Sequence, residues 1–355
     1  MRSPMKNLKL ILQSLLITSF LTTVGCDKHA RSFSILDDTA EYKQNGTTFS
    51  RKIDILWVID NSGSMESSQN NLAQNFLSFY NRFEKLNFDF HMAVTTSDAY
   101  LAKFNNNPSL SLLKDGNKTS GPLGHPVMDN TLTDLEAVFL TNIKQGISGY
   151  GDERAFDSLE QVLTNPGNSN FLRSDAFLAV IIVSDEDDFS TTTKRYLQQN
   201  YNAPEMIPLS HYTQFLDTIT NSGSIKNYSV SAISIFDQTC LDQLNSQISG
   251  RVIGKRYAQI VEATGGVKGS LCSNFGETLE LISDSIIELS SVYNLTRKPI
   301  VETITVVVDG VSILEDELQG WTYNETENSI HFHGSAIPKA GASIAINFDP
   351  LTIKL

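Results

Sequence analysis

Basic residues are scarce in this chain of 355 residues. Lys and Arg together number 27, against 40 Asp and Glu, and the formal net charge is −13. A protein that binds the phosphate backbone of nucleic acids needs a basic face, and an acidic chain gains nothing from the charge of anionic lipid headgroups. We therefore expect no nucleic acid among its partners, and no binding to a lipid surface by charge alone.

Common sequence signatures of catalysis are also missing. The sequence contains no Gly-x-Ser-x-Gly nucleophile motif and no phosphate-binding loop. His91 stands in the middle of a predicted strand, where a structural role is favoured over that of a general base. His331 and His333 share one face of a later predicted strand at metal-binding spacing, but a solvated face is the favoured interpretation. We expect the chain not to be an enzyme.

Residues 1–25 are predicted to be an export signal. Basic residues precede an uncharged, mostly apolar run from Leu10 to Val24, which is too short and too interrupted by polar residues for a comfortable spanning helix. The run ends in Thr-Thr-Val-Gly-Cys, which resembles the lipobox of bacterial lipoproteins. The resemblance implies a lipidated Cys26 and a lipid-anchored protein of the bacterial cell envelope, in a membrane and leaflet left open. Ordinary secretion is the alternative.

Only three cysteines are present, and their use agrees with export. Residues 26–52 are expected to form a polar tether that begins at the lipidated Cys26. Cys240 and Cys272 then remain, and a disulfide between them is expected in an oxidising compartment, where it would contribute about 3–4 kcal/mol. Two free buried thiols are the alternative. A metal site at this pair is not supported, because no Cys-x-x-Cys motif or nearby histidine accompanies it.

Predicted strands alternate with predicted helices over residues 53–296. Nearly continuous apolar runs have the composition of buried strands, at 53–59, 88–96, 177–184 and 229–236. Helical patterns separate or follow them, the last at 275–293. Strands joined through helices form a parallel sheet that is covered on both faces. We therefore predict a doubly wound, mostly parallel, Rossmann-like α/β domain, with its ligand site at the carboxyl ends of the strands.

After Pro299 the pattern is that of β-structure alone. Short runs typical of strands occur at 304–308, 329–333 and 344–348, without a helical pattern between them. Residues 299–355 are therefore predicted to form a small all-β module. Because so short a segment cannot bury a large core, we expect it to pack on the larger domain or on a partner.

An oxygen-rich motif follows the first predicted strand. Asp60, Ser62 and Ser64 occupy alternate positions on a turn that leads into a helix, and Gly63 lets the backbone bend between the serines. Hard dications such as Mg²⁺ prefer carboxylate, hydroxyl and water oxygens. The motif therefore predicts a site for Mg²⁺, with Ca²⁺ or Mn²⁺ as the other candidates.

The segment Ile55–Met65 resembles the first strand and the metal-ion-dependent adhesion site (MIDAS) of von Willebrand factor type A (vWA) domains, and the resemblance extends over about residues 53–293. In that family the two serines coordinate the ion directly, and the aspartate usually acts through water. A further aspartate follows the central strand, which corresponds to Asp185 here. The family's threonine is replaced by a carboxylate near Asp152 or Glu153. We assign the position to Glu153, with a solvent-facing side chain as the alternative.

A carboxylate at this position would add negative charge, tighten ion binding and shift the preference towards Ca²⁺. Asp187 and Asp188 are expected to be solvated or to support the ligands from behind. Thr95 or Thr96 lies at the end of the second predicted strand and could support the ion through water, although simple packing is favoured.

Together these features predict a bacterial envelope lipoprotein that binds a protein ligand through a divalent metal, in adhesion or in the assembly of an envelope complex. An acidic side chain of the ligand would complete the coordination of the ion. A metal-independent structural scaffold of the envelope is the first alternative. A metal-assisted hydrolase is the less favoured second one.

Overall fold

The computed structural model describes residues 52–351, apart from residues 198 and 224. The predicted signal, most of the tether and Cys26 lie outside the described residues. Within the described part of the chain, no helix has both the length and the apolar character needed to cross a membrane.

A six-stranded sheet forms the centre of the larger domain, in the order β3-β2-β1-β4-β5-β6. Its strands are β1 (Lys52–Ile59), β2 (Asp89–Thr96), β3 (Val127–Asp129), β4 (Ala176–Val183), β5 (Tyr228–Ser234) and β6 (Lys268–Ser270). Neighbouring strands are parallel except β2 and β3, which are antiparallel. The prediction of a doubly wound, mostly parallel sheet is confirmed.

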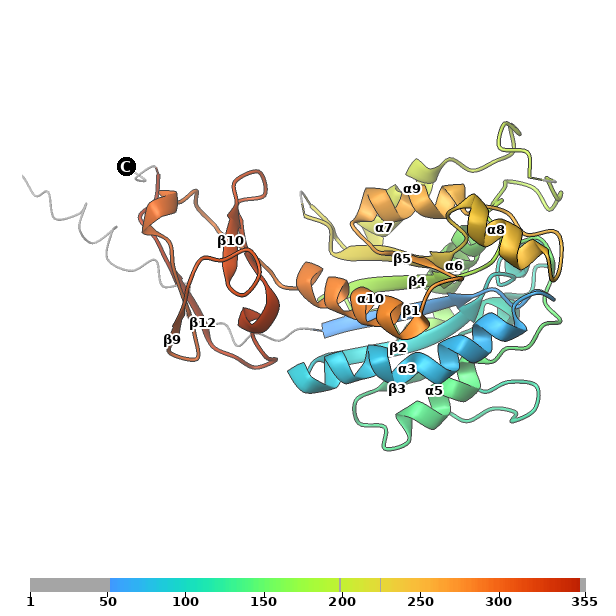
Figure 1. The fold of residues 1–355 in the computed structure, drawn as a ribbon, viewed down its shortest axis with the longest axis horizontal. Coiled ribbons are helices and arrows are strands. Elements are labelled where there is room, and N and C mark those ends of the chain that lie inside the picture. The colour runs from blue at the N-terminus through green and yellow to red at the C-terminus, as the bar shows by residue number, and fades with distance from the viewer. Residues whose placement is uncertain (1–51, 198, 224, 352–355) are drawn as a thin grey trace, which may run out of the picture.

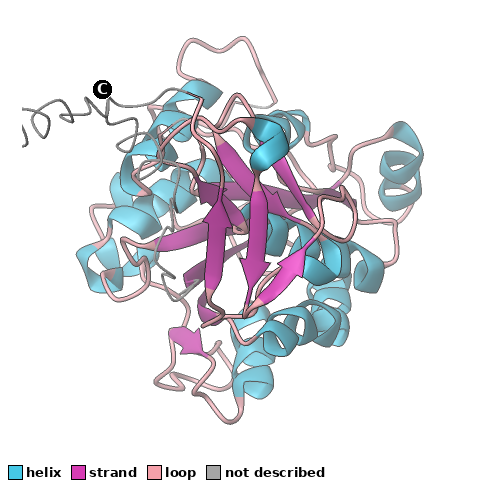
Figure 2. Ribbon diagram, turned by 90° about the vertical axis from the view of Figure 1, so that its left-hand side faces the viewer, coloured by secondary structure: helices cyan, strands magenta, loops and turns pink. Residues whose placement is uncertain are grey.

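Helices cover both faces of this sheet (Figures 1 and 2). The main ones are α3 (Glu66–Leu86), α5 (Leu135–Ile143), α6 (Ala155–Thr164), α7 (Leu209–Ile219), α9 (Lys255–Thr264) and α10 (Phe275–Leu289), and α4 (Leu101–Phe104) and α8 (Gln238–Asn245) are shorter. Trp57 of β1 packs in the apolar core with α3, α5 and α10, whereas Leu56 and Val58 pack in the core with α6, α7 and α9. Burial on both faces explains why the strands are continuously apolar.

The C-terminal module consists of two three-stranded antiparallel sheets, β10-β11-β7 and β12-β8-β9. Its strands are β7 (Val292–Asn294), β8 (Thr305–Val308), β9 (Val311–Ile313), β10 (Trp321–Asn324), β11 (Ser329–Phe332) and β12 (Ile344–Asn347). Trp321, Phe332 and Ile344 belong to its small core. The predicted all-β character of this segment agrees with the structure.

The helix predicted over 275–293 is too long, and this prediction is wrong at its end. The helix stops at Leu289, and Val292 and Tyr293 pair with β11 of the C-terminal module instead. Their apolar side chains continue the helical spacing of the sequence, but they belong to a strand. The module therefore begins within the range expected for the larger domain.

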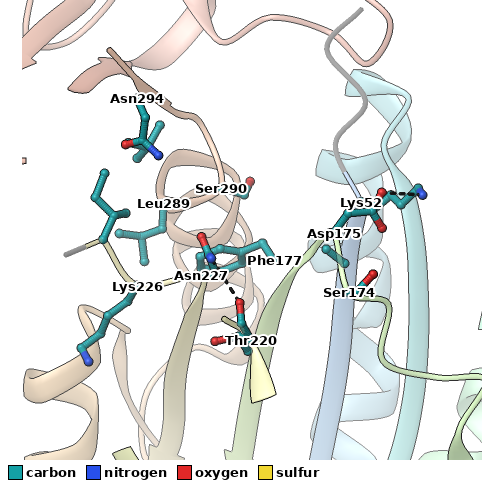
Figure 3. Close-up of a pocket in the computed structure, with 13 residues that line it drawn as sticks. Lys52, Ser174, Asp175, Phe177, Thr220, Lys226, Asn227, Leu289, Ser290 and Asn294 are labelled. Carbon is teal, nitrogen blue, oxygen red and sulfur yellow. Dashed lines mark hydrogen bonds and ion pairs between the residues drawn. The ribbon is translucent and has the colours of Figure 1, made fainter. Parts of the chain in front are cut away.

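The module lies beyond the end of the sheet at which β1 begins (Figure 1). The backbone N–H of Ala340 donates to the carbonyl of Leu86 at 3.1 Å, at the end of α3. A cavity of about 270 Å³ opens at this end of the sheet, between Lys52, Phe177 and Asn294 (Figure 3). It lies at the opposite end of β1 from Asp60, and so does not belong to the predicted site.

Cys240 of α8 and Cys272 form a disulfide, with their Cα atoms 5.7 Å apart. The predicted pairing is confirmed. The bridge joins α8 to the segment that leads into α10, and its two cysteines are 32 positions apart in the sequence.

Candidate metal centre

The carboxyl ends of β1 and β4 bring two predicted ligand segments together. Ile59 is level with Val183 in the parallel register, and the backbone N–H of Asp60 donates to the carbonyl of Val183 at 2.9 Å. The carboxylate of Asp60 accepts from the hydroxyl of Ser184 and from the backbone N–H of Ser62, both at 2.8 Å. Both oxygens of this buried carboxylate are therefore fixed in place.

The two serines connect this carboxylate to Asp185. The hydroxyl oxygens of Ser62 and Ser64 are 3.3 Å apart, and Ser64 donates to Oδ1 of Asp185 at 3.0 Å. Asp60, Ser62, Ser64 and Asp185 thus gather at one edge of the sheet from the two loops that follow β1 and β4. Such a set of carboxylate and hydroxyl oxygens matches the ligand preferences of a hard dication.

Glu153 lies just before α6 and is 1% exposed, so the alternative of a solvent-facing side chain is wrong. Its Oε2 accepts from the hydroxyl of Ser97 at 2.5 Å, whereas its Oε1 is buried without a hydrogen-bond partner. Burial, together with the negative charge of Asp60, raises the pKa of Glu153 well above its usual range. An unpaired buried carboxylate oxygen is costly in a protein interior.

The neighbouring carboxylates are perturbed in the same direction. Burial, with a contribution from the charge of Asp185, raises the pKa of Asp60 to about 6. Burial and the charges of Asp60 and Asp185 raise the pKa of Glu186 to about 8. Several partly desolvated acids face one another here, and a divalent cation would favour their ionised forms. The residues present fit such an ion.

None of the histidines that the structure describes belongs to this site. Among the described residues, no group of three or more His, Cys, Asp or Glu side chains is arranged to hold a metal, so an ion at this edge would depend on hydroxyl ligands as well. Nε2 of His331 lies 2.9 Å from Oε2 of Glu327, whereas Nδ1 of His333 lies 2.6 Å from Oε1 of Glu288 in α10. Each histidine is thus paired with a different acid, and their side chains, 22% and 15% exposed, are partly buried and not on the solvated face that was expected.

Arg251, in the segment between α8 and α9, was not predicted from the sequence. Its Nε donates to Oδ2 of Asp185 at 2.6 Å, and the two side chains are only 4% and 2% exposed. The guanidinium therefore balances one carboxylate of the candidate site. The two residues are 66 positions apart, and no local pattern around Arg251 points to this pairing.

Asp187 and Asp188 are fully buried, so the first of their two expected roles, that of solvated side chains, is wrong. Asp187 accepts from the backbone N–H of Arg256 at 3.0 Å, and Asp188 accepts from that of Phe156 at 2.9 Å. These N–H groups belong to the first turns of α9 and α6, where backbone donors lack partners within the helix. The two aspartates therefore anchor both helices behind the site.

Thr95 and Thr96 are both buried at the end of β2. Thr96 donates to Oδ1 of Asp98 at 2.5 Å. The hydroxyl of Thr95 has no hydrogen-bond partner among the described residues. Thr96 therefore stabilises the loop after β2, because its hydroxyl already donates to Asp98.

Comparison with known proteins finds only distant structural likenesses. No protein-family model matches the sequence, and no curated protein matches it. Similar solved structures include the pilus adhesin SpaC from Lactobacillus rhamnosus GG, with a TM-score of 0.40 and 10% identity over 86% of this chain and 39% of that chain. Proximal thread matrix protein 1 from the mussel byssus has a TM-score of 0.36 and 13% identity over 71% of this chain and 51% of that chain.

The ArnB paralog VWA2 from Sulfolobus acidocaldarius has a TM-score of 0.31 and 10% identity, over 86% of this chain and 58% of that chain. One structure of the byssus protein is described as having a zinc-occupied MIDAS motif. Each likeness spans less than two thirds of the other chain. At these scores and identities they carry no functional argument, and the α/β fold rests on the strand order and layers described above.

Proposed function

We propose that this chain is a vWA-type lipoprotein of the bacterial cell envelope that binds a protein ligand through a divalent ion. Asp60, Ser62, Ser64 and Asp185 would hold the ion, and Glu153 would add a further carboxylate. The observation that carries the proposal is that Asp60, Ser62, Ser64 and Asp185 lie together at the carboxyl ends of β1 and β4. In addition, one oxygen of Glu153 is buried and unpaired.

The formal charges of the site balance those of a divalent ion. Asp60, Asp185 and Glu153 contribute three formal negative charges, and Arg251 cancels one of them through its ion pair. Glu186 is left out of this count because we do not propose it as a ligand. A dication would bring the formal charge of the site to zero, and a carboxylate from a partner protein would bind as a further oxygen ligand of the ion.

Export and anchoring rest on the sequence motif at Cys26 and are supported by the disulfide. The bond between Cys240 and Cys272 is of a kind that persists in oxidising compartments such as the bacterial periplasm or the cell surface. A lipid anchor at the N-terminus would keep the α/β domain at a membrane while its metal edge binds a partner.

Crosslinking pull-downs from envelope extracts test this function. We expect the wild-type chain to capture a partner with Mg²⁺ and to lose it with EDTA. The double variant Asp60→Ala/Ser62→Ala should fail in both conditions, whereas Glu160→Gln, which changes a carboxylate of α6 that contacts His211, should behave as wild type. Equal capture by wild type in EDTA would contradict the proposal and favour a metal-independent scaffold.

A further inference from the structure

We propose that Arg251 makes the site prefer Mg²⁺ over Ca²⁺, because it leaves Asp185 only one free carboxylate oxygen. This inference rests on the proposed function, since it concerns the same ion. Arg251 acts as a positioning residue: its guanidinium bonds to the carboxylate of Asp185 and to backbone carbonyls.

The geometry divides the two oxygens of Asp185 between different partners. Oδ2 accepts from Nε of Arg251 at 2.6 Å, and Oδ1 accepts from the hydroxyl of Ser64 at 3.0 Å. Of the two oxygens, Oδ1 is therefore the one that contacts a serine hydroxyl of the candidate site. The guanidinium also donates to the backbone carbonyl of Ser64 at 3.3 Å, which ties the turn after β1 to the same side chain.

The position of Arg251 is itself fixed. Its Nη1 donates to the carbonyls of Leu244 and Ile248 at 2.6 and 2.5 Å, at the end of α8 and in the loop beyond it. Its backbone N–H donates to Oδ1 of Asn245 at 3.1 Å. The disulfide at Cys240 in turn fastens α8 to the rest of the domain. The guanidinium is thus held from several directions, unlike a mobile surface side chain.

The two ions differ in what they accept from a carboxylate. Ca²⁺ takes six to eight oxygens at flexible geometry and often binds both oxygens of one carboxylate. Mg²⁺ requires near-octahedral geometry, takes single oxygens and keeps several waters. A carboxylate whose second oxygen is bonded to Arg251 suits Mg²⁺, whereas freeing Oδ2 of Asp185 would favour Ca²⁺. Arg251 thereby opposes the shift towards Ca²⁺ that the carboxylate of Glu153 would cause.

Titration calorimetry of the metal-stripped protein with Mg²⁺ or Ca²⁺ alone tests this inference. Removing the positive charge should tighten both ions, so the informative quantity is the ratio of the two dissociation constants. We expect Arg251→Gln to shift this ratio at least tenfold towards Ca²⁺. Arg251→Lys keeps the charge but loses the fork of donors, and it should shift the ratio at least threefold. The control Arg195→Gln removes the same charge from a side chain that is 76% exposed, and should leave the ratio within twofold.

Each outcome separates this inference from the proposed function. An unchanged ratio in Arg251→Gln would overturn the role of Arg251 while leaving the metal site in place. Failure of the wild-type chain to bind either ion would overturn the metal site, and the inference with it. Should circular dichroism show that Arg251→Gln does not fold, Arg251→Lys decides: an unchanged ratio in that variant overturns the inference, and the threefold shift supports it.

Discussion

Substitution of Glu153 by Gln should stabilise the metal-free protein while weakening its response to divalent ions. The carboxylate of Glu153 is buried, one of its oxygens has no partner, and Asp60 lies close enough to raise its pKa. Gln has nearly the same shape and no charge. Its amide oxygen can accept from Ser97, and the loss of the charge removes the repulsion from Asp60.

The magnitude follows from the cost of the unpaired group. A buried polar group without a partner costs about 1–3 kcal/mol, and more when it is charged. We therefore expect Glu153→Gln to raise the free energy of unfolding by about 1–3 kcal/mol in EDTA at pH 7.5. The raised pKa of Glu153 means that the folded state retains the proton to higher pH than the unfolded state does. The gain should therefore shrink as the pH falls and disappear below the unfolded value of 4.5.

Urea unfolding followed by circular dichroism measures both effects. An ion at one hundred times its dissociation constant stabilises the folded state by about 2.7 kcal/mol, and the same Mg²⁺ concentration should stabilise Glu153→Gln by clearly less. The matched control is Glu160→Gln on α6, the helix that follows Glu153. Its partly exposed carboxylate pairs with His211, and the substitution should change stability by less than about 1 kcal/mol. A Glu153→Gln variant that is less stable than wild type in EDTA, or that gains equally from Mg²⁺, would refute the reasoning.

Three other perturbations have defined outcomes. Replacing Cys240 and Cys272 by Ser should cost about 4 kcal/mol in urea unfolding, from the loop that the disulfide closes, and a loss below about 1 kcal/mol would contradict this. Burial raises the pKa of Asp157 to about 6 although Tyr212 donates to it, so ionisation destabilises the fold as the pH rises through that value. Asp157→Asn should accordingly gain up to about 3 kcal/mol at pH 8 and nothing near pH 3.5, and equal effects at both pH values would speak against it. Cys26→Ser should move the protein from the membrane fraction to the soluble fraction, and retention at the membrane would argue against lipidation.

The fold and the centre of the site could be predicted because their signals are local. The strands predicted at 53–59 and 177–184, which correspond to β1 and β4, are continuous apolar runs. Asp60, Ser62 and Ser64 follow β1 within five positions. Asp185 could be placed because the most apolar run of the mature chain ends just before it. Parallel pairing then brings both loops to one edge of the sheet.

The remaining features depend on contacts between distant segments. Arg251 contacts Asp185 across 66 positions, and nothing in its own segment indicates an ion pair. Asp187 and Asp188 lie in an acidic segment whose sequence is typical of an exposed loop. Backbone N–H groups in the first turns of two helices donate to them and make their burial possible. The three-residue strand β3 is too short for a periodic signal.

Direct measurement of Mg²⁺ binding tests the central claim of an oxygen site at the edge of the sheet. Equilibrium dialysis of the metal-stripped chain should find about one Mg²⁺ per chain for wild type and none for the variant Asp60→Ala/Ser62→Ala, with circular dichroism confirming that both are folded. A wild-type chain that binds no ion, or a double variant that binds as the wild type does, would contradict the account.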